Sequence, residues 1–168
     1  MKTTSLRTRK PRAKRQRGAN SLRALHFLLG LWHCESDSPR GRVSCEREFR
    51  LVLGGRFIEM RAHWTIGRGA RYEEIALFGR GLSGKPCVVS FTSDGLRSEG
   101  QATDAREIHA RAVGFESQMP AGLARQIWWP LEEGGLAWIV EARTRTGWRR
   151  FVEHHYRPDS RTRQRRRP

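Results

Sequence analysis

The feature that most constrains this chain is a succession of short segments in which apolar and polar residues alternate. The clearest of them is RFIEMRAHWTI, residues 56–66. Side chains of a strand point alternately to its two faces, so this alternation predicts a strand with one buried face. One face carries Ile58, Met60, Ala62, Trp64 and Ile66, and the other carries Glu59, Arg61 and His63.

Nine further segments continue this pattern, and turn sequences such as GRG, SDG, MPAG and EEGG separate them. Since no long helical segment connects them, neighbouring strands should pair antiparallel. Closing such a meander into an up-and-down barrel removes its exposed edges. A barrel of about ten strands has an interior that side chains fill or a ligand occupies. The nine segments are residues 31–37, 43–51, 70–80, 86–93, 96–104, 107–118, 123–132, 136–146 and 148–157.

Glycines mark two of the expected turns. In LVLGGRFIEM, Gly54 and Gly55 permit positive φ at a tight hairpin between two strands, or a kink at a barrel corner. The stretch GRGLSGK, residues 79–85, has the glycine spacing of a phosphate-binding loop. Pro86 nevertheless stands where such a loop has Ser or Thr, and a strand follows instead of a helix. This stretch therefore also predicts a hairpin turn.

The two ends of the chain differ from its body. Residues 1–20 contribute eight positive charges and residues 157–168 a net five, so the 136 residues between them carry only three of the total of +16. We expect residues 1–20 and 158–168 to be disordered basic tails around a barrel domain of residues 21–157. A short helix should precede the first strand, with Leu22, Leu25, His26 and Leu29 on one face and Gly30 at its end.

Three cysteines, Cys34, Cys45 and Cys87, are too few and too scattered for a disulfide framework or a zinc site. A symmetric turn at residues 38–41 would place Cys34 opposite Cys45 as two reduced thiols. We therefore expect a cytoplasmic protein. The apolar run after residue 20 contains Arg23 and His26 and lacks a cleavage site, and no run approaches the ~18 residues of a membrane span.

Four stretches of the sequence resemble a known group of proteins. They are Gly30-Leu31-Trp32, a G-x-W before the first strand, then residues 46–64, residues 72–80 and the final strand WRRFVEHHYR. Together they resemble uncharacterised bacterial lipocalin-like (calycin) β-barrel proteins of the domain-of-unknown-function type, over roughly residues 20–158. Nitrobindin-type haem barrels are more distant relatives of that group.

The resemblance implies an up-and-down barrel with a possible internal small-molecule site. In calycins the tryptophan of G-x-W closes one end of the barrel against a basic residue of the last strand. Here it implies that Trp32 packs against Arg149, Arg150 or Arg157 in a structural role. Haem is an alternative cofactor, because His154 and His155 lie in the last strand.

Residues that could contact a ligand follow from the strand faces. If Trp148, Val152 and Tyr156 share a face, His154 and Arg150 join them. Aromatic residues would supply contact area, Arg150 would meet an acid group, and His154 would donate a hydrogen bond or ligate a metal. Which face is interior does not follow from the period. The predicted ligand-binding residues are Trp64, Trp129, Trp138, Arg150 and His154.

These observations favour a binding protein over an enzyme. No G-x-S-x-G is present, and carboxylate pairs such as Glu73-Glu74 are adjacent and so point to opposite faces or lie in turns. We expect a non-enzymatic barrel that binds a small apolar or amphipathic molecule. The alternative is binding of nucleic acid or an acidic partner by the Arg-rich tails, to which phosphates are attracted. The ligand's identity and the oligomeric state are left open.

Overall fold

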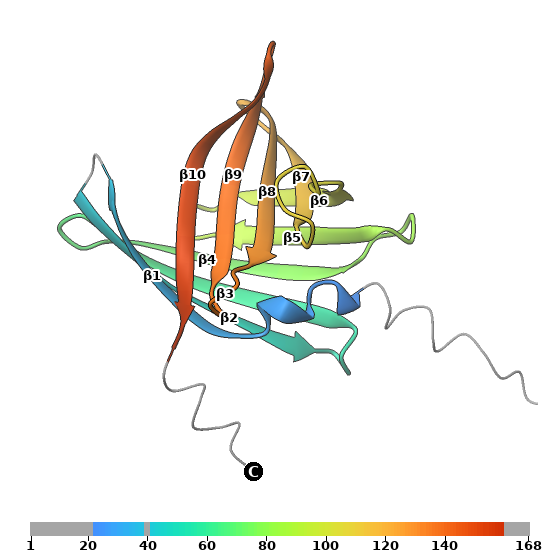
Figure 1. Cartoon of the computed structure of the whole chain (residues 1–168), viewed down its shortest axis with the longest axis horizontal. Coiled ribbons are helices and arrows are strands. Elements are labelled where there is room, and N and C mark those ends of the chain that lie inside the picture. The colour runs from blue at the N-terminus through green and yellow to red at the C-terminus, as the bar shows by residue number, and fades with distance from the viewer. Residues whose placement is uncertain (1–21, 39–40, 160–168) are drawn as a thin grey trace, which may run out of the picture.

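The computed structural model describes residues 22–38 and 41–159, and over these residues the chain is a closed barrel of ten antiparallel strands. Each strand pairs with its neighbours in sequence, and β1 closes the barrel against β10. Figure 1 shows β8–β10 crossing β2–β5 steeply. The predicted up-and-down barrel is thus confirmed. The strands are β1 Gly30–Ser38, β2 Gly41–Val52, β3 Phe57–Ile66, β4 Ala70–Arg80, β5 Pro86–Thr92, β6 Arg97–Thr103, β7 Val113–Met119, β8 Gly122–Pro130, β9 Leu136–Thr144 and β10 Gly147–Pro158.

Both glycine-rich stretches form hairpins, as predicted. Gly54 and Gly55 lie between β2 and β3 with φ values of 68° and 75°. Residues 81–85 connect β4 to β5, with Gly84 at a φ of 80°. The predicted strand over residues 107–118 is shorter, because residues 104–112 form a loop that packs outside β8 and β9 through Ala105, Ile108 and Ala112.

Of the expected N-terminal helix, the described residues contain only the α-helical residues 22–23, followed by a 3-10 turn, η1 His26–Leu28. Leu22, Leu25 and Leu28 are buried, whereas His26, expected on the same face, is exposed. Backbone hydrogen bonds from Leu25 to Leu22 and from Leu28 to Leu25 follow the three-residue period. The buried leucines stand at every third position, and this spacing favours the tighter 3-10 turn. Among the described residues no helix is long and apolar enough to cross a membrane.

This N-terminal segment lies at one end of the barrel, which we call the plugged end. There its leucines join a core of large apolar side chains. Toward the far end, where the hairpin residues 67–69 and 145–146 lie, inward-facing side chains such as Trp64, Tyr72 and His154 are only half-buried. The barrel interior thus becomes more accessible from the plugged end to the far end. The core residues at the plugged end are Leu22, Leu25, Leu28, Phe49, Ile58, Phe78, Phe115, Trp128 and Leu136.

The tails were expected outside residues 21–157. Residues 1–21 and 160–168 lie outside the described residues, so their predicted disorder stays a prediction. At the C-terminal boundary, β10 continues through Pro158, and the N–H of Asp159 donates to the carbonyl of Leu31.

Candidate functional site in the barrel interior

A charged side chain lies in the middle of the barrel. Along β2, Val43, Cys45, Arg47 and Phe49 alternate inward, and all four are buried. The Arg47 side chain is fully enclosed, with 0% of the residue exposed. Burying a charge costs several kcal/mol unless partners compensate it, so the surroundings of Arg47 are the first place to seek a function.

Aromatic rings surround the Arg47 guanidinium. Its Cζ lies 4.2 Å from the ring centroid of Trp138 and 4.9 Å from those of Trp64 and Trp128. Arg47 Nε donates to the hydroxyl of Tyr156 at 2.8 Å. Ring faces attract a cation most strongly when both are removed from water. Four side chains from β3, β8, β9 and β10 therefore hold this cation in place.

One carboxylate approaches the guanidinium without hydrogen-bonding to it. Glu74 on β4 faces inward, and its Oε2 lies 3.9 Å from Arg47 Nη1. That distance is too long for a hydrogen bond. Arg47 Nη1 donates to Met60 Sδ at 3.0 Å instead. Glu74 thus balances part of the buried charge through space and leaves hydrogen-bonding capacity on the guanidinium unused.

Four buried N–H donors in the interior have no hydrogen-bond partner among the described residues. They are Arg47 Nη2 and the indole Nε1 atoms of Trp64, Trp128 and Trp138. Leaving a buried donor unpaired costs about 1–3 kcal/mol. All four belong to the cluster around Arg47. The unpaired groups of this site are therefore hydrogen-bond donors, which only acceptor atoms can satisfy.

His154 lies between this cluster and the far end. Its ring stacks on that of Trp138, with the ring centroids 5.7 Å apart, and is T-shaped to that of Trp64, with the centroids 5.3 Å apart. Its Nδ1 pairs with the hydroxyl of Ser36 at 3.2 Å. Burial lowers the pKa of His154 below 6.5, and the charges of Arg47 and His155 lower it further. The imidazole is therefore neutral at pH 7.

Two thiols adjoin the same cluster. Cys34 and Cys45 lie directly opposite each other on β1 and β2, and both are free, as the sequence predicted. Burial raises the pKa of Cys45, but the Cys34 hydrogen bond and the Arg47 charge outweigh it, so the pKa is lowered to about 7. A hydrogen bond with Cys45, together with burial, raises the pKa of Cys34, which keeps its proton.

The structure brings three of the five predicted ligand-binding residues together. Trp64, Trp138 and His154 all point into the barrel and contact one another. Trp129 does not join them. It lies on the outer surface, where it packs beneath residues 104–112 and stacks on His109 at 6.2 Å. Its neighbour Trp128 is the inward residue of the pair, because the two side chains alternate along β8.

Arg150 is also absent from the interior. It lies on the outer surface, where its Nε is 3.5 Å from Glu141 and its Nη1 donates to Glu153 at 2.8 Å. The cause is a β-bulge. Arg150 pairs with Glu141 and Val152 with Val140, so one extra residue of β10 lies between them. A shift of one residue exchanges the two faces, and Arg150 turns outward while Val152, His154 and Tyr156 point inward.

Trp32 lies beside the last strand but not in the arrangement that the resemblance implied. It is opposite Pro158, and its indole donates to the carbonyl of Leu28 at 2.6 Å. This bond fastens the N-terminal segment to the barrel. Arg149 and Arg150 lie toward the opposite end of β10, and the exposed Arg157 is opposite His33.

Sequence reasoning missed Arg47, although a signal was present. In VSCEREFRL the inward period runs through Cys45, Arg47 and Phe49, so a basic residue occupies an otherwise apolar face. Once Cys45 is placed opposite Cys34, the same alternation puts Arg47 in the interior. A charged residue on the inward face of an otherwise apolar strand is therefore the sequence signal that indicates this kind of site.

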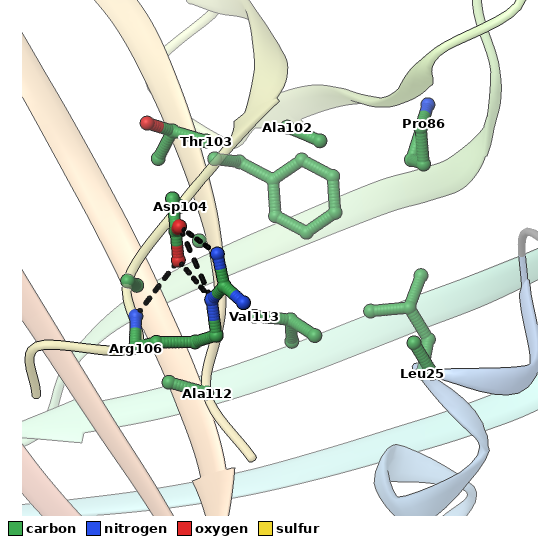
Figure 2. A pocket seen from close by; sticks show the side chains of 12 residues that line it. Leu25, Pro86, Ala102, Thr103, Asp104, Arg106, Ala112 and Val113 are labelled. Carbon is green, nitrogen blue, oxygen red and sulfur yellow. Dashed lines mark hydrogen bonds and ion pairs between the residues drawn. The ribbon is translucent and has the colours of Figure 1, made fainter. Parts of the chain in front are cut away.

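A separate pocket of about 190 Å³ lies at the plugged end. Figure 2 shows Leu25, Pro86 and Val113 around it, with the Asp104–Arg106 ion pair at its margin. Arg106 satisfies Asp104 through several hydrogen bonds. Since ligand pockets usually measure about 300–1,000 Å³, this pocket is small for a ligand site. The unpartnered donors lie elsewhere, so we take the Arg47 cluster as the candidate site.

Comparison with known proteins adds the following. A solved structure described as a de novo designed fluorescence-activating β-barrel is 14% identical to this chain, with a TM-score of 0.41. The match covers 81% of this chain and 97% of that one. No protein-family model and no curated protein matches the chain. The functional argument therefore rests on the interior residues themselves.

Proposed function

We propose that this chain is a non-enzymatic, lipocalin-like barrel that binds a small amphipathic molecule in its interior. One observation carries the proposal. The barrel gathers three tryptophans, a tyrosine and a histidine around a buried arginine, and leaves four N–H donors of that cluster without partners. Ligand sites typically combine such aromatic walls with a few convergent polar groups.

The strand register supports one direction of entry for the proposed ligand. Trp64 pairs with Cys45, one inward position nearer the far end than Arg47. His154 bonds to Ser36, which pairs with Val43, a further position along. Trp64 and His154 are half-buried, whereas Arg47 is enclosed. The ligand would thus enter past Trp64 and His154 with its polar end toward Arg47.

A neutral fluorescent dye tests this proposal on the full chain. N-phenyl-1-naphthylamine brightens when it leaves water for an apolar site, and we expect saturable binding with one site per chain. Trp138→Leu should weaken this binding about 5- to 30-fold, since an interior aromatic side chain contributes on the order of 1–2 kcal/mol. Trp129→Leu, on the outer surface, is the matched control and should leave it unchanged. Equal effects of both variants would contradict an interior site.

The protein from its own host offers a second test. Native mass spectrometry of the full chain, purified under mild conditions, should show an added mass in one-to-one ratio that Trp138→Leu removes. The interior site would be contradicted if Trp138→Leu retained the added mass and deletion of residues outside the barrel removed it.

A second candidate function rests on the basic ends of the chain. Residues 1–20 alone contribute eight positive charges, and the body is nearly balanced. Binding to nucleic acid through these ends would weaken steeply with salt, in proportion to the number of phosphates contacted. A titration of the full chain with a single-stranded oligonucleotide between 50 and 200 mM salt, roughly the range over which such binding changes most, separates this function from dye binding, which should change little.

The interior does not fit haem. An axial histidine needs open space in front of its ring nitrogen for the macrocycle. The ring centroids of Trp138 and Trp64 lie 5.7 Å and 5.3 Å from that of His154. These two rings occupy space beside the imidazole that a porphyrin would need, so we derive no step through it.

The three free thiols are compatible with a reducing compartment, and we propose a cytoplasmic location.

A further inference from the structure

We infer that the ligand of this barrel is an organic acid, and that its carboxylate pairs with Arg47 Nη2 inside the aromatic cluster. This inference rests on the proposed function, because it names the chemical class that the interior site selects. In it, Arg47 and Trp138 bind the carboxylate, and Glu74 limits how tightly it binds.

The first step is the kind of atom that the site lacks. The unpartnered buried groups are all N–H donors: Arg47 Nη2 and three indole nitrogens. A ligand head group with further donors would leave them unpaired. A head group with acceptor oxygens would satisfy Nη2 and a neighbouring indole. The Trp138 ring lies closest to the guanidinium, with its centroid 4.2 Å from Arg47 Cζ.

The second step is charge. Arginine is always protonated in proteins, so the enclosed site holds a permanent positive charge. His154 adds no charge at neutral pH, because its pKa is lowered, and Cys45 adds no negative charge below its pKa of about 7. Hydrogen bonds between an arginine and a carboxylate are about twice as strong as those between neutral groups. An ammonium head group would be repelled, and an alcohol would satisfy one donor without neutralising the charge.

The third step concerns Glu74, the one carboxylate already near. It lies 3.9 Å from Nη1, on a side chain that is 16% exposed, and it does not reach Nη2. It therefore neutralises the site only in part when no ligand is bound. It is also a like charge for an entering carboxylate, so its removal should strengthen acid binding. A site built only to hold Arg47 in the core would not show this effect.

The test compares three ligands with the same ten-carbon chain. Decanoate, decanol and decylamine compete with N-phenyl-1-naphthylamine for the full-length protein at about pH 6.5, where Cys45 is mainly a neutral thiol, and below the concentrations at which they form micelles. We expect decanoate to bind at least about tenfold more tightly than decanol, and decylamine to bind most weakly.

Three variants assign the preference to residues. Arg47→Met keeps the volume, removes the charge and should abolish the difference between acid and alcohol; Arg47→Lys should retain part of it. Glu74→Gln should tighten decanoate binding severalfold and leave decanol unchanged. Arg150→Met is the matched control, since Arg150 is an arginine on the outer surface, and it should change none of these values. Should Arg47→Met fail to fold, Glu74→Gln and Arg47→Lys still decide the question.

Each other outcome has a definite meaning. If decanol binds as tightly as decanoate to the wild type, the acid inference is wrong while the proposed function stands. The same holds if Glu74→Gln weakens decanoate binding. If neither the dye nor any of the three ten-carbon ligands binds, both the inference and the proposed function are overturned.

Discussion

Arg47 combines a buried charge with a donor nitrogen, Nη2, that has no hydrogen-bond partner among the described residues. An enclosed charge is costly. Here one hydrogen bond to Tyr156, contacts to three tryptophan rings and the Glu74 carboxylate at 3.9 Å offset that cost. A desolvated cation–π contact contributes on the order of 2 kcal/mol, comparable to a charged hydrogen bond. The side chain is therefore held firmly while Nη2 is left for another partner.

His154 gives a prediction at the same scale. Its pKa is lowered in the folded chain, so between that pKa and 6.5 the unfolded chain binds the proton that the folded chain does not. The stability that depends on neutral His154 is complete above pH 6.5 and falls as the pH drops through this window.

Urea denaturation at pH 7.5 and pH 5 measures this dependence. In His154→Gln the loss of stability on acidification should be smaller than in the wild type. His33→Gln, which replaces an exposed histidine on β1, is the control and should behave like the wild type. An unchanged pH dependence in His154→Gln would contradict the lowered pKa.

At the scale of elements, hairpins and one bulge decide what faces the interior. Without the bulge in β10, Arg150 would share the face of His154, as the alternation alone indicated. Period-two patterns fix which residues share a face only while the strand is regular. The sequence carries no signal for the extra residue near Phe151, so the alternation placed Arg150 on the face of His154.

The β2–β3 hairpin gives a prediction for one element. Gly55 has a φ of 75°, and a Cβ there would have open space around it. Gly55→Ala should therefore cost about 1 kcal/mol through backbone strain alone. Gly55→Asn should cost less, because asparagine tolerates this conformation better. Chemical denaturation of the two variants measures the difference, and equal stability of both with the wild type would refute the strain.

At the scale of the whole molecule, the N-terminal segment makes the two ends of the barrel different. Leu28 is 0% exposed and packs into the main core, and its carbonyl accepts from the Trp32 indole. This segment covers one end, while half-buried aromatic side chains lie toward the other. This difference between the ends supports the proposed entry of a ligand from the far end.

Leu28→Ala tests the plugged end. It should lower the free energy of unfolding by about 2–5 kcal/mol, as for other leucines truncated in a packed core. Leu82, fully exposed in the β4–β5 turn, is the matched control. Leu82→Ala should stay within about 0.5 kcal/mol of the wild type. Similar losses for both variants would show that the segment is not part of the cooperative core.

The sequence by itself determined the barrel, because alternation, turn residues and the absence of a crossover helix are local properties. It placed Ile58, Met60, Ala62 and Trp64 on one face and Cys34 opposite Cys45. Only the tertiary structure decided the site. Three features depend on strand register, on a bulge and on contacts between distant residues such as Arg47 and Tyr156, which are 109 positions apart. They are the interior member of the Trp128–Trp129 pair, the outward turn of Arg150 and the enclosure of Arg47. Such contacts leave no periodic trace in the sequence, since each is made by strands that meet only when the barrel closes.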